Sequence, residues 1–381
     1  MTSNSPRPSV ALIFPFFAGG GAEAVALWAA QALQDDYNVT ILTATTIDLA
    51  DLNGMYATNI KLNKVSIQTQ FPDFLARLIF YIRTNISFFK PLLHHYFIRW
   101  IKTLSKRFDV CFSGYNAMDM GCPGVQYIHW HDVLLNRNFY WLSKFSESRA
   151  FQNLSVSNSI YTAIAVEKKC GFTTEVLYPP VPRDPDVEVV PWQMRDEFSF
   201  ICSGRITKPK MPDRIIKILY EVRKQGFDVK LHLTGGGGGT YGDSYVREVE
   251  ELAHEHSDWV TLHMNLPYQD YLEVLRHCRY GFHLKPEPFG ISVAEIVQMG
   301  LIPFVRSQGG QLEIVGQENP ELIIADKAKA KDQIISVLRH PQRQQEILKN
   351  LEERRHLFTP ERFMEGTKAL VRQFLDQKYP H

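Results

Sequence analysis

The sequence predicts an α/β protein built from two doubly wound parallel sheets. Short, continuously apolar runs alternate with helical patterns through almost all of its 381 residues. Runs of this kind are typical of parallel strands that helices cover on both faces. The length exceeds what one hydrophobic core usually holds, so two domains are expected.

The expected strands fall into two groups of six. The first group comprises residues 10–16, 39–44, 110–114, 125–128, 154–157 and 175–178. The second comprises residues 198–203, 229–233, 260–264, 280–284, 302–305 and 322–325. Strand–helix–strand repetition within each group favours two Rossmann-like sheets, in which ligands bind beyond the carboxyl ends of the strands.

Five prolines between residues 179 and 191 exclude helix and central strand from this stretch. We therefore expect an N-terminal domain at 1–180, a Pro-rich linker at 181–196 and a second domain at 197–355. Residues 356–381 are expected to contain a helix, because apolar side chains recur there at helical spacing. Its packing on the N-terminal domain is one arrangement left open.

The amino-acid composition argues against several classes of protein. The 42 Lys and Arg residues are balanced by 41 Asp and Glu residues, which argues against a dedicated nucleic-acid binder. The five scattered cysteines include no CxxC pair, so a reducing compartment is favoured over a disulfide framework or a zinc site. No apolar run approaches the roughly 18 residues that a membrane span needs. We therefore expect a cytoplasmic enzyme.

The strongest chemical motif is Lys285-Pro-Glu-Pro-Phe-Gly-Ile-Ser-Val-Ala-Glu295. A strand ends before it, and Gly290 opens a helix whose free N–H groups can bind phosphate. Ser292 can add a hydroxyl donor. Glu287 and Glu295 can accept hydrogen bonds from hydroxyls at the two ends of a ligand. The alternative is a capped helix with two solvated acids, and the combination of features favours a binding site.

E-P-F-G-x-x-x-x-E resembles the E-x7-E signature of retaining glycosyltransferases of the GT-B fold, most closely glycosyltransferase family 4. The resemblance implies two Rossmann-like domains facing each other across a cleft, with the donor nucleotide sugar on the second and the acceptor on the first. It also implies that Glu287 contacts the donor sugar and Glu295 the ribose of the nucleotide. The backbone that meets the sugar and the diphosphate is then that of Phe289, Gly290, Ile291 and Ser292.

A second stretch resembles the same family. Ser203-Gly-Arg-Ile-Thr-Lys-Pro-Lys210 looks like its G-R-x-x-x-x-K segment, which implies that Arg205 and Lys210 hold the diphosphate. Two cations suit a leaving group that gathers negative charge. Taken alone, the segment is equally a basic surface loop. Met211 stands where the family usually has Gly, which raises the question of whether the local turn differs.

The N-terminal half offers two further candidates. Phe17-Ala-Gly-Gly-Gly-Ala-Glu23 matches the family's G-G-A-E loop, so Gly20 and Gly21 are implied to lie beside the donor phosphate and acceptor. The loop is not G-x-G-x-x-G, which disfavours an NAD-dependent oxidoreductase.

The second candidate follows the expected strand at residues 125–128. The family has a His just after the corresponding strand. We favour His129, with His131 as the competitor, and expect no metal there because further ligands are lacking.

Three more stretches complete the implied donor site. The glycines of Thr234-Gly-Gly-Gly-Gly-Gly239 resemble the family's G-x-G turn near the pyrophosphate. Residues 307–313 resemble a G-G-x-x-E stretch that closes the site. The implied pyrophosphate and base contacts are Gly235, Gly237, Asn265 and Leu266.

Residues 74–108 carry seven Lys and Arg residues, no Asp or Glu, and many interleaved aromatic side chains. This composition favours helices that lie on an anionic bilayer surface. Ordinary domain helices with core aromatics and solvated cations are an equally weighted alternative.

Together these patterns predict a retaining, hexosyltransferase-type glycosyltransferase. It would move a sugar from a UDP- or GDP-sugar to a sugar, lipid-linked or small-molecule acceptor, such as a glycolipid or growing polysaccharide at the inner face of a membrane. No metal, other cofactor or nucleic acid is expected. The alternatives are a non-catalytic nucleotide-sugar-binding subunit and a GT-B nucleotide-sugar epimerase.

Overall fold

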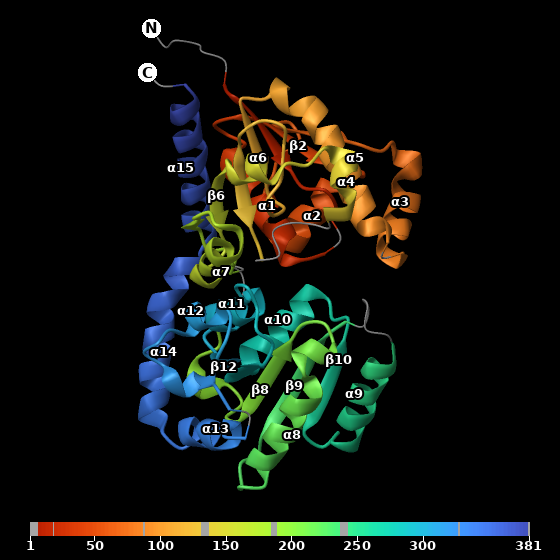
Figure 1. Cartoon of the computed structure of the whole chain (residues 1–381). Coiled ribbons are helices and arrows are strands. Elements are labelled where there is room, and N and C mark those ends of the chain that lie inside the picture. Colours follow the sequence, from red (N-terminus) through yellow and green to blue (C-terminus); the bar gives the residue numbers. More distant parts are fainter. Residues whose placement is uncertain are drawn as a thin grey trace. The chain divides into compact units, whose positions relative to one another are not determined.

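The computed structural model describes residues 7–17, 19–86, 88–130, 137–183, 189–236, 243–326 and 328–379. Contacts within the chain define two compact units. The first comprises Met1–Pro180 together with Thr359–His381, and the second comprises Val181–Phe358. Each unit contains one parallel sheet with covering helices (Figure 1), which confirms the predicted α/β class with two Rossmann-like sheets.

The first unit has a seven-stranded parallel sheet in the order β3-β2-β1-β4-β5-β6-β7. Its strands are β1 (Ser9–Ile13), β2 (Asn38–Thr43), β3 (Val65–Thr69), β4 (Val110–Ser113), β5 (Val125–Ile128), β6 (Leu154–Ser157) and β7 (Glu175–Val176). Its helices are α1 (Gly21–Leu33), α2 (Leu49–Tyr56), α3 (Asp73–Asn85), α4 (Phe89–Leu104), α5 (Tyr140–Ser143), α6 (Glu147–Phe151), α7 (Ile160–Cys170) and α15 (Pro360–Lys378).

The second unit has a six-stranded sheet in the order β10-β9-β8-β11-β12-β13. Its strands are β8 (Ser199–Ser203), β9 (Lys230–Gly235), β10 (Val260–Met264), β11 (Tyr280–His283), β12 (Ile302–Arg306) and β13 (Ile323–Ile324). Its helices are α8 (Pro212–Arg223), α9 (Asp243–Glu255), α10 (Tyr268–His277), α11 (Ile291–Gln298), α12 (Gln311–Val315), α13 (Ala330–Leu338) and α14 (Pro341–Arg355).

Each of the twelve expected apolar runs overlaps a strand, but β3 was missed. β3 pairs only with β2 and forms one edge of the sheet. Val65 is its one buried residue, and its other side chains are exposed or half-buried. A strand that is open on one side does not need a continuous apolar run, so the criterion that finds central strands cannot find this one.

The C-terminal helix α15 belongs to the first unit. Its N-terminus follows the usual signals, since Pro360 stands in the first turn and the Thr359 hydroxyl accepts a hydrogen bond from the Arg362 N–H. Phe363, Val371 and Phe374 join the hydrophobic core that α1 forms over the first sheet. Within the described ranges, no helix is both long enough and apolar enough to cross a membrane.

Candidate functional site

The carboxyl ends of β8 and β11 bring a carboxylate, two lysines and a histidine together in the second unit. Lys285 Nζ lies 3.0 Å from both carboxylate oxygens of Glu287, and Lys210 Nζ lies 4.0 Å from Oε1. His283 Nε2, at the end of β11, lies 3.6 Å from the same oxygen. Of these four residues, the sequence motifs implied roles for Glu287 and Lys210 only. His283 and Lys285 were missed, although both lie within four residues of Glu287.

These neighbours determine the charge of Glu287. Burial acts to raise the pKa of Glu287, but His283, Lys285 and Lys210 outweigh it and lower that pKa to about 2. Burial lowers the pKa of Lys210, an effect that Glu287 opposes. Glu287 is therefore a carboxylate at neutral pH, suited to accepting hydrogen bonds and not to donating a proton.

The backbone that carries Glu287 is held by the Gly309-Gly310-Gln311 segment. The buried Gln311 side chain accepts a hydrogen bond from the Glu287 N–H at 2.8 Å and donates one to the Lys285 carbonyl at 3.0 Å. The Gly310 N–H donates to the Glu287 carbonyl at 2.8 Å. A Cβ on Gly309 would lie 2.5 Å from that carbonyl oxygen, and one on Gly310 would lie 2.1 Å from the Pro288 carbonyl oxygen. Both positions therefore require glycine.

Glu295 lies on α11 in a different environment. Burial raises its pKa to about 7, although the Tyr271 hydroxyl and Lys210 act to lower it. The Tyr271 hydroxyl donates to Oε2 at 3.3 Å. Glu295 lines a small pocket with Tyr271, Tyr268 and Arg183. The Tyr271 partner was missed, because the tyrosine lies on α10 and no local pattern connects it to α11.

The N-terminus of α11 lies between these two acids. Gly290 precedes the helix with φ of 107°, and its carbonyl accepts hydrogen bonds from the N–H groups of Val293 and Ala294. Ile291 and Ser292 form the first turn, where N–H groups favour an anion. The Phe289 side chain is buried against Phe358, which leaves its backbone as the part that can meet a ligand.

The two cations in the segment after β8, Arg205 and Lys210, differ in their exposure to solvent. Arg205 is exposed, whereas Lys210 is only 17% exposed and donates to the Ser203 carbonyl at 3.3 Å. Met211, at the place where the resembling family has Gly, adopts the left-handed conformation with φ of 56°. The side chain at this position therefore does not prevent the conformation that a glycine readily adopts.

The glycine-rich turn after β9 is only partly described. A Cβ on Gly235 would lie 2.3 Å from the Gly204 carbonyl oxygen, so close packing of two strand ends accounts for this glycine. The Gly235 carbonyl accepts a hydrogen bond from Asn265, which is exposed at the end of β10 and precedes Leu266. Gly237 lies outside the described residues.

In the first unit, the loop before α1 is held by two side chains. The Gly20 N–H donates to the Tyr56 hydroxyl at 2.9 Å, and that hydroxyl donates to Glu23 Oε2 at 2.8 Å. The Gly19 N–H donates to the same carboxylate oxygen at 3.0 Å. The Gly20 amide is therefore already used within the fold, whereas Gly21 begins α1. Tyr56 lies 33 residues from Glu23 and was missed.

His129 follows β5, but the fold uses one of its ring nitrogens. Nε2 donates to the Gly114 carbonyl at 2.8 Å, and burial lowers the pKa of His129 to about 4. Its ring is therefore neutral at physiological pH. The competing His131 lies outside the described residues. Among the residues that are described, no group of three or more His, Cys, Asp or Glu side chains is placed to hold a metal ion.

Comparison with known proteins finds similarity to glycosyltransferases. Residues 191–354 match the family model described as "Glycosyl transferases group 1". A curated relative, the GDP-Man:Man(3)GlcNAc(2)-PP-Dol alpha-1,2-mannosyltransferase of Xenopus laevis, is 27% identical over 184 residues. That match covers 44% of this chain, and this chain spans only 38% of the relative's length.

Solved structures resemble the whole chain. Anabaena Alr3699/HepE in complex with UDP and glucose has a TM-score of 0.67 at 15% identity, covering 96% of this chain and 100% of that one. WaaG, a glycosyltransferase involved in lipopolysaccharide biosynthesis, has a TM-score of 0.61 at 13% identity, covering 95% and 99%. At these identities the likeness shows the fold, which is the GT-B fold. The family match and the fold together support a glycosyltransferase.

Proposed function

We propose that this protein is a retaining glycosyltransferase of family 4 that transfers a hexosyl group from a UDP- or GDP-sugar to an acceptor hydroxyl. The observation that carries the proposal is the arrangement around α11. An ionised carboxylate, Glu287, and a half-buried carboxyl, Glu295, lie in the chain before and after a helix N-terminus, with Lys210 within electrostatic reach of both. This arrangement suits a ligand with hydroxyls at both ends and a diphosphate between them.

The proposed roles follow from the charges. Glu287 accepts hydrogen bonds from hydroxyls of the donor sugar, and Glu295 accepts them from the ribose. The N-terminus of α11, Arg205 and Lys210 stabilise the diphosphate as the bond between the anomeric carbon and the phosphate oxygen breaks. These positive groups do the work that a metal ion would otherwise do, so the proposal needs no metal.

The retaining step is proposed as a same-face substitution. The acceptor oxygen bonds to the anomeric carbon on the face that the diphosphate leaves, and the departing phosphate oxygen takes the acceptor proton. Because the pKa of Glu287 is about 2, its carboxylate positions the sugar and stabilises developing positive charge without exchanging a proton. His129, neutral and bound to a backbone carbonyl, is likewise a positioning group of the acceptor-side unit.

The acceptor is proposed to be lipid-linked and presented at the cytoplasmic face of a membrane. The names of two similar proteins support a lipid-linked acceptor. The Xenopus relative is named for a dolichol-linked substrate, and WaaG is named for a role in lipopolysaccharide biosynthesis.

A thermal-shift screen against UDP, GDP and ADP tests the donor site. One diphosphate should raise the melting temperature of the wild type and raise that of Glu295→Ala clearly less. Glu250→Ala, at an exposed position on α9, is the matched control and should respond as the wild type does. Absence of a shift with every diphosphate would contradict the proposal.

An assay of sugar transfer distinguishes the proposed enzyme from the alternative, a non-catalytic nucleotide-sugar-binding subunit. With the sugar conjugate of the diphosphate that binds, proton NMR of the product should show the anomeric configuration of the donor. Inversion would contradict the retaining mechanism, and nucleotide binding without release of the sugar would favour the non-catalytic subunit.

A further inference from the structure

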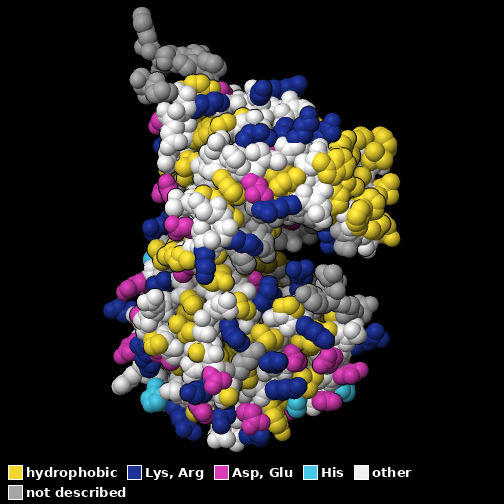
Figure 2. Space-filling model, in the orientation of Figure 1, with side chains coloured by type: hydrophobic (Ala, Val, Ile, Leu, Met, Phe, Trp, Pro, Cys, Tyr) yellow, Lys and Arg dark blue, Asp and Glu magenta, His cyan; other side chains and the backbone are white. Residues whose placement is uncertain are grey.

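Helix α3 carries an apolar surface that the fold does not cover. None of its described residues is buried. Phe74, Leu78 and Tyr81 are 81%, 53% and 62% exposed, and their spacing places them on one face of the helix. Figure 2 shows this patch over the position of α3 in Figure 1. The patch is extended by Phe80, Ile86 and Phe88.

Positive charge accompanies this apolar surface. Arg77 on α3 and Lys90 at the start of α4 are exposed, and Arg83 stacks on the ring of Phe16 with its guanidinium carbon 4.7 Å from the ring centre. The sequence has no Asp or Glu between residues 74 and 108. Asp73, the first residue of α3, is the one acid on this helix among its described residues. An exposed aromatic face with cations and a single acid at one end matches the interface of an anionic bilayer better than it matches water.

Helix α4 does not share this surface. Phe97, Ile98 and Ile101 are buried in the core beneath the first sheet. Lys102 lies 2.6 Å from the buried Asp119 and donates to two backbone carbonyls, so its charge is used inside the unit. Of the two interpretations of residues 74–108, the core interpretation therefore holds for most of α4, and the exposed surface is confined to α3 and its junction with α4.

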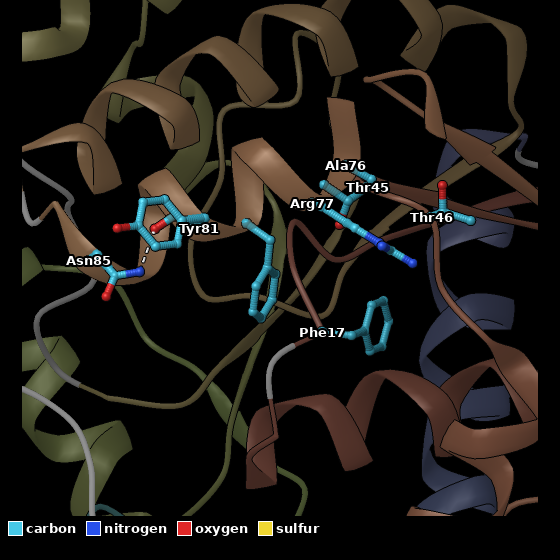
Figure 3. A pocket seen from close by; sticks show the side chains of 8 residues that line it. Phe17, Thr45, Thr46, Ala76, Arg77, Tyr81 and Asn85 are labelled. Atoms are coloured by element: carbon cyan, nitrogen blue, oxygen red, sulfur yellow. Dashed lines mark hydrogen bonds between the residues drawn. The ribbon is translucent and has the colours of Figure 1, made fainter. Parts of the chain in front are cut away.

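A pocket of about 470 Å³ lies beside the patch. It extends from Phe17 and Thr45, which follow β1 and β2, to the side of α3 (Figure 3). Its one charged lining residue among those described is Arg77. Tyr81 belongs to both the pocket and the apolar face, so a molecule seated in the pocket has a route along α3 to the patch. Its other lining residues are Thr46, Ala76, Phe80 and Asn85.

We propose that α3 docks on an anionic bilayer with Phe74, Leu78 and Tyr81 in the interface, and that the pocket holds the anionic head of a lipid acceptor anchored in that bilayer. The apolar face supplies the burial, and the cations supply the attraction to anionic lipid. Docking by α3 stands independently of the proposed transfer reaction, whereas the identity of the pocket as an acceptor seat rests on it.

Vesicle flotation of the full chain tests the docking. The wild type should float with vesicles that contain phosphatidylglycerol, float less at high salt, and stay unbound with pure phosphatidylcholine. The triple variant Phe74→Ser, Leu78→Ser, Tyr81→Ser should lose flotation and keep its melting temperature, since these side chains are exposed. Leu62→Ser, which changes an equally exposed apolar residue elsewhere in the unit, should float normally.

Three outcomes would overturn the docking. They are no flotation of the wild type, flotation that ignores lipid charge, and undiminished flotation of the triple variant. Light scattering adds a check, because a wild-type dimer that the triple variant converts to monomer without any flotation would assign the patch to a second copy of the chain.

The pocket is tested with farnesyl phosphate as a water-soluble anionic lipid. It should give a saturable thermal shift with the wild type, and inorganic phosphate alone should give none. Ala76→Trp, which fills the pocket, should remove the shift and retain flotation. An unchanged shift in this variant, or no shift in the wild type, would contradict the acceptor seat. Failure of the nucleotide screen would contradict the proposed function, and with it the acceptor role of the pocket, and would leave the flotation result standing.

Discussion

The side chain of Gln311 bridges the backbone on both sides of Pro286. Its Oε1 accepts from the Glu287 N–H at 2.8 Å, and its Nε2 donates to the Lys285 carbonyl at 3.0 Å. Gln311 is fully buried, so no water competes for these bonds. The carboxylate of Glu287 is thus supported by a backbone that is rigid before a ligand binds.

Gln311→Leu should lower both stability and transfer. It takes the Gln311 partner from the Glu287 N–H and the Lys285 carbonyl, both part-buried, at a cost of at most about 1–3 kcal/mol for each group. We expect a lower melting temperature and a lower kcat, with nucleotide affinity changed little. Gln333→Leu, which removes one hydrogen bond to the Ile323 carbonyl, is the control. Equal loss of kcat in both variants would argue against a specific role for Gln311.

Glu287→Gln should abolish most transfer and preserve nucleotide binding. The amide cannot neutralise Lys285 and Lys210 or accept sugar hydrogen bonds as strongly, so we expect kcat to fall on the order of 100-fold or more. Calorimetry with the nucleoside diphosphate should show affinity equal to or tighter than that of the wild type, because the local charge becomes more positive. A large loss of diphosphate affinity would place Glu287 at the nucleotide instead.

Glu295 should make nucleotide binding and stability depend on pH in opposite senses. Its pKa is about 7 in the folded protein against an ordinary 4.5, so the folded state binds its proton more tightly. The free energy of unfolding of the wild type should therefore fall as pH rises from 4.5 through 7, by up to about 3 kcal/mol. In the proposed site, the carboxylate that forms over this range is the acceptor for the ribose hydroxyls, so nucleotide affinity should rise with pH.

The variant Glu295→Gln separates these effects. It should be more stable than the wild type at pH 8 and similar to it near pH 4.5, as measured by denaturant unfolding. Its nucleotide affinity should be weaker and should show no rise through pH 7. Parallel pH profiles for the two proteins would exclude Glu295 as the titrating group.

Asp119→Ala should destabilise the first unit strongly. The fully buried Asp119 carboxylate lies 2.6 Å from Lys102 and 2.8 Å from Arg149, and it also accepts from the Ser146 N–H at 2.7 Å. Removing it leaves the partly buried Lys102 without its anion, at a cost of about 3–5 kcal/mol in unfolding free energy. Urea unfolding measures the effect. Asp36→Ala, which breaks the exposed pair with Lys368, should cost less than about 1 kcal/mol.

Local sequence was sufficient to predict the two sheets, apart from β3, and to place the residues of the proposed donor site after particular strands. Central strands such as β1 and β8 are buried on both faces, so their apolar runs stand out, and the residues after them lie at one edge of the sheet. The Glu287–Glu295 spacing needs only one strand end and one helix to be meaningful. The edge strand β3 was not predicted, because most of its side chains are exposed or half-buried and it therefore lacks a continuous apolar run.

The partners of these residues were decided by the tertiary structure. Gln311 reaches Glu287 from 24 positions away, Tyr271 reaches Glu295 from α10, and the His129 ring is bound by the Gly114 carbonyl. The amino-acid sequence alone was enough to predict the fold class and which acids and cations follow which strands, because periodicity and chain order are local properties. Only the packed structure decided which aromatic helix is core and which is exposed, and which carboxyl is ionised, because burial and charge depend on neighbours that are distant in the chain.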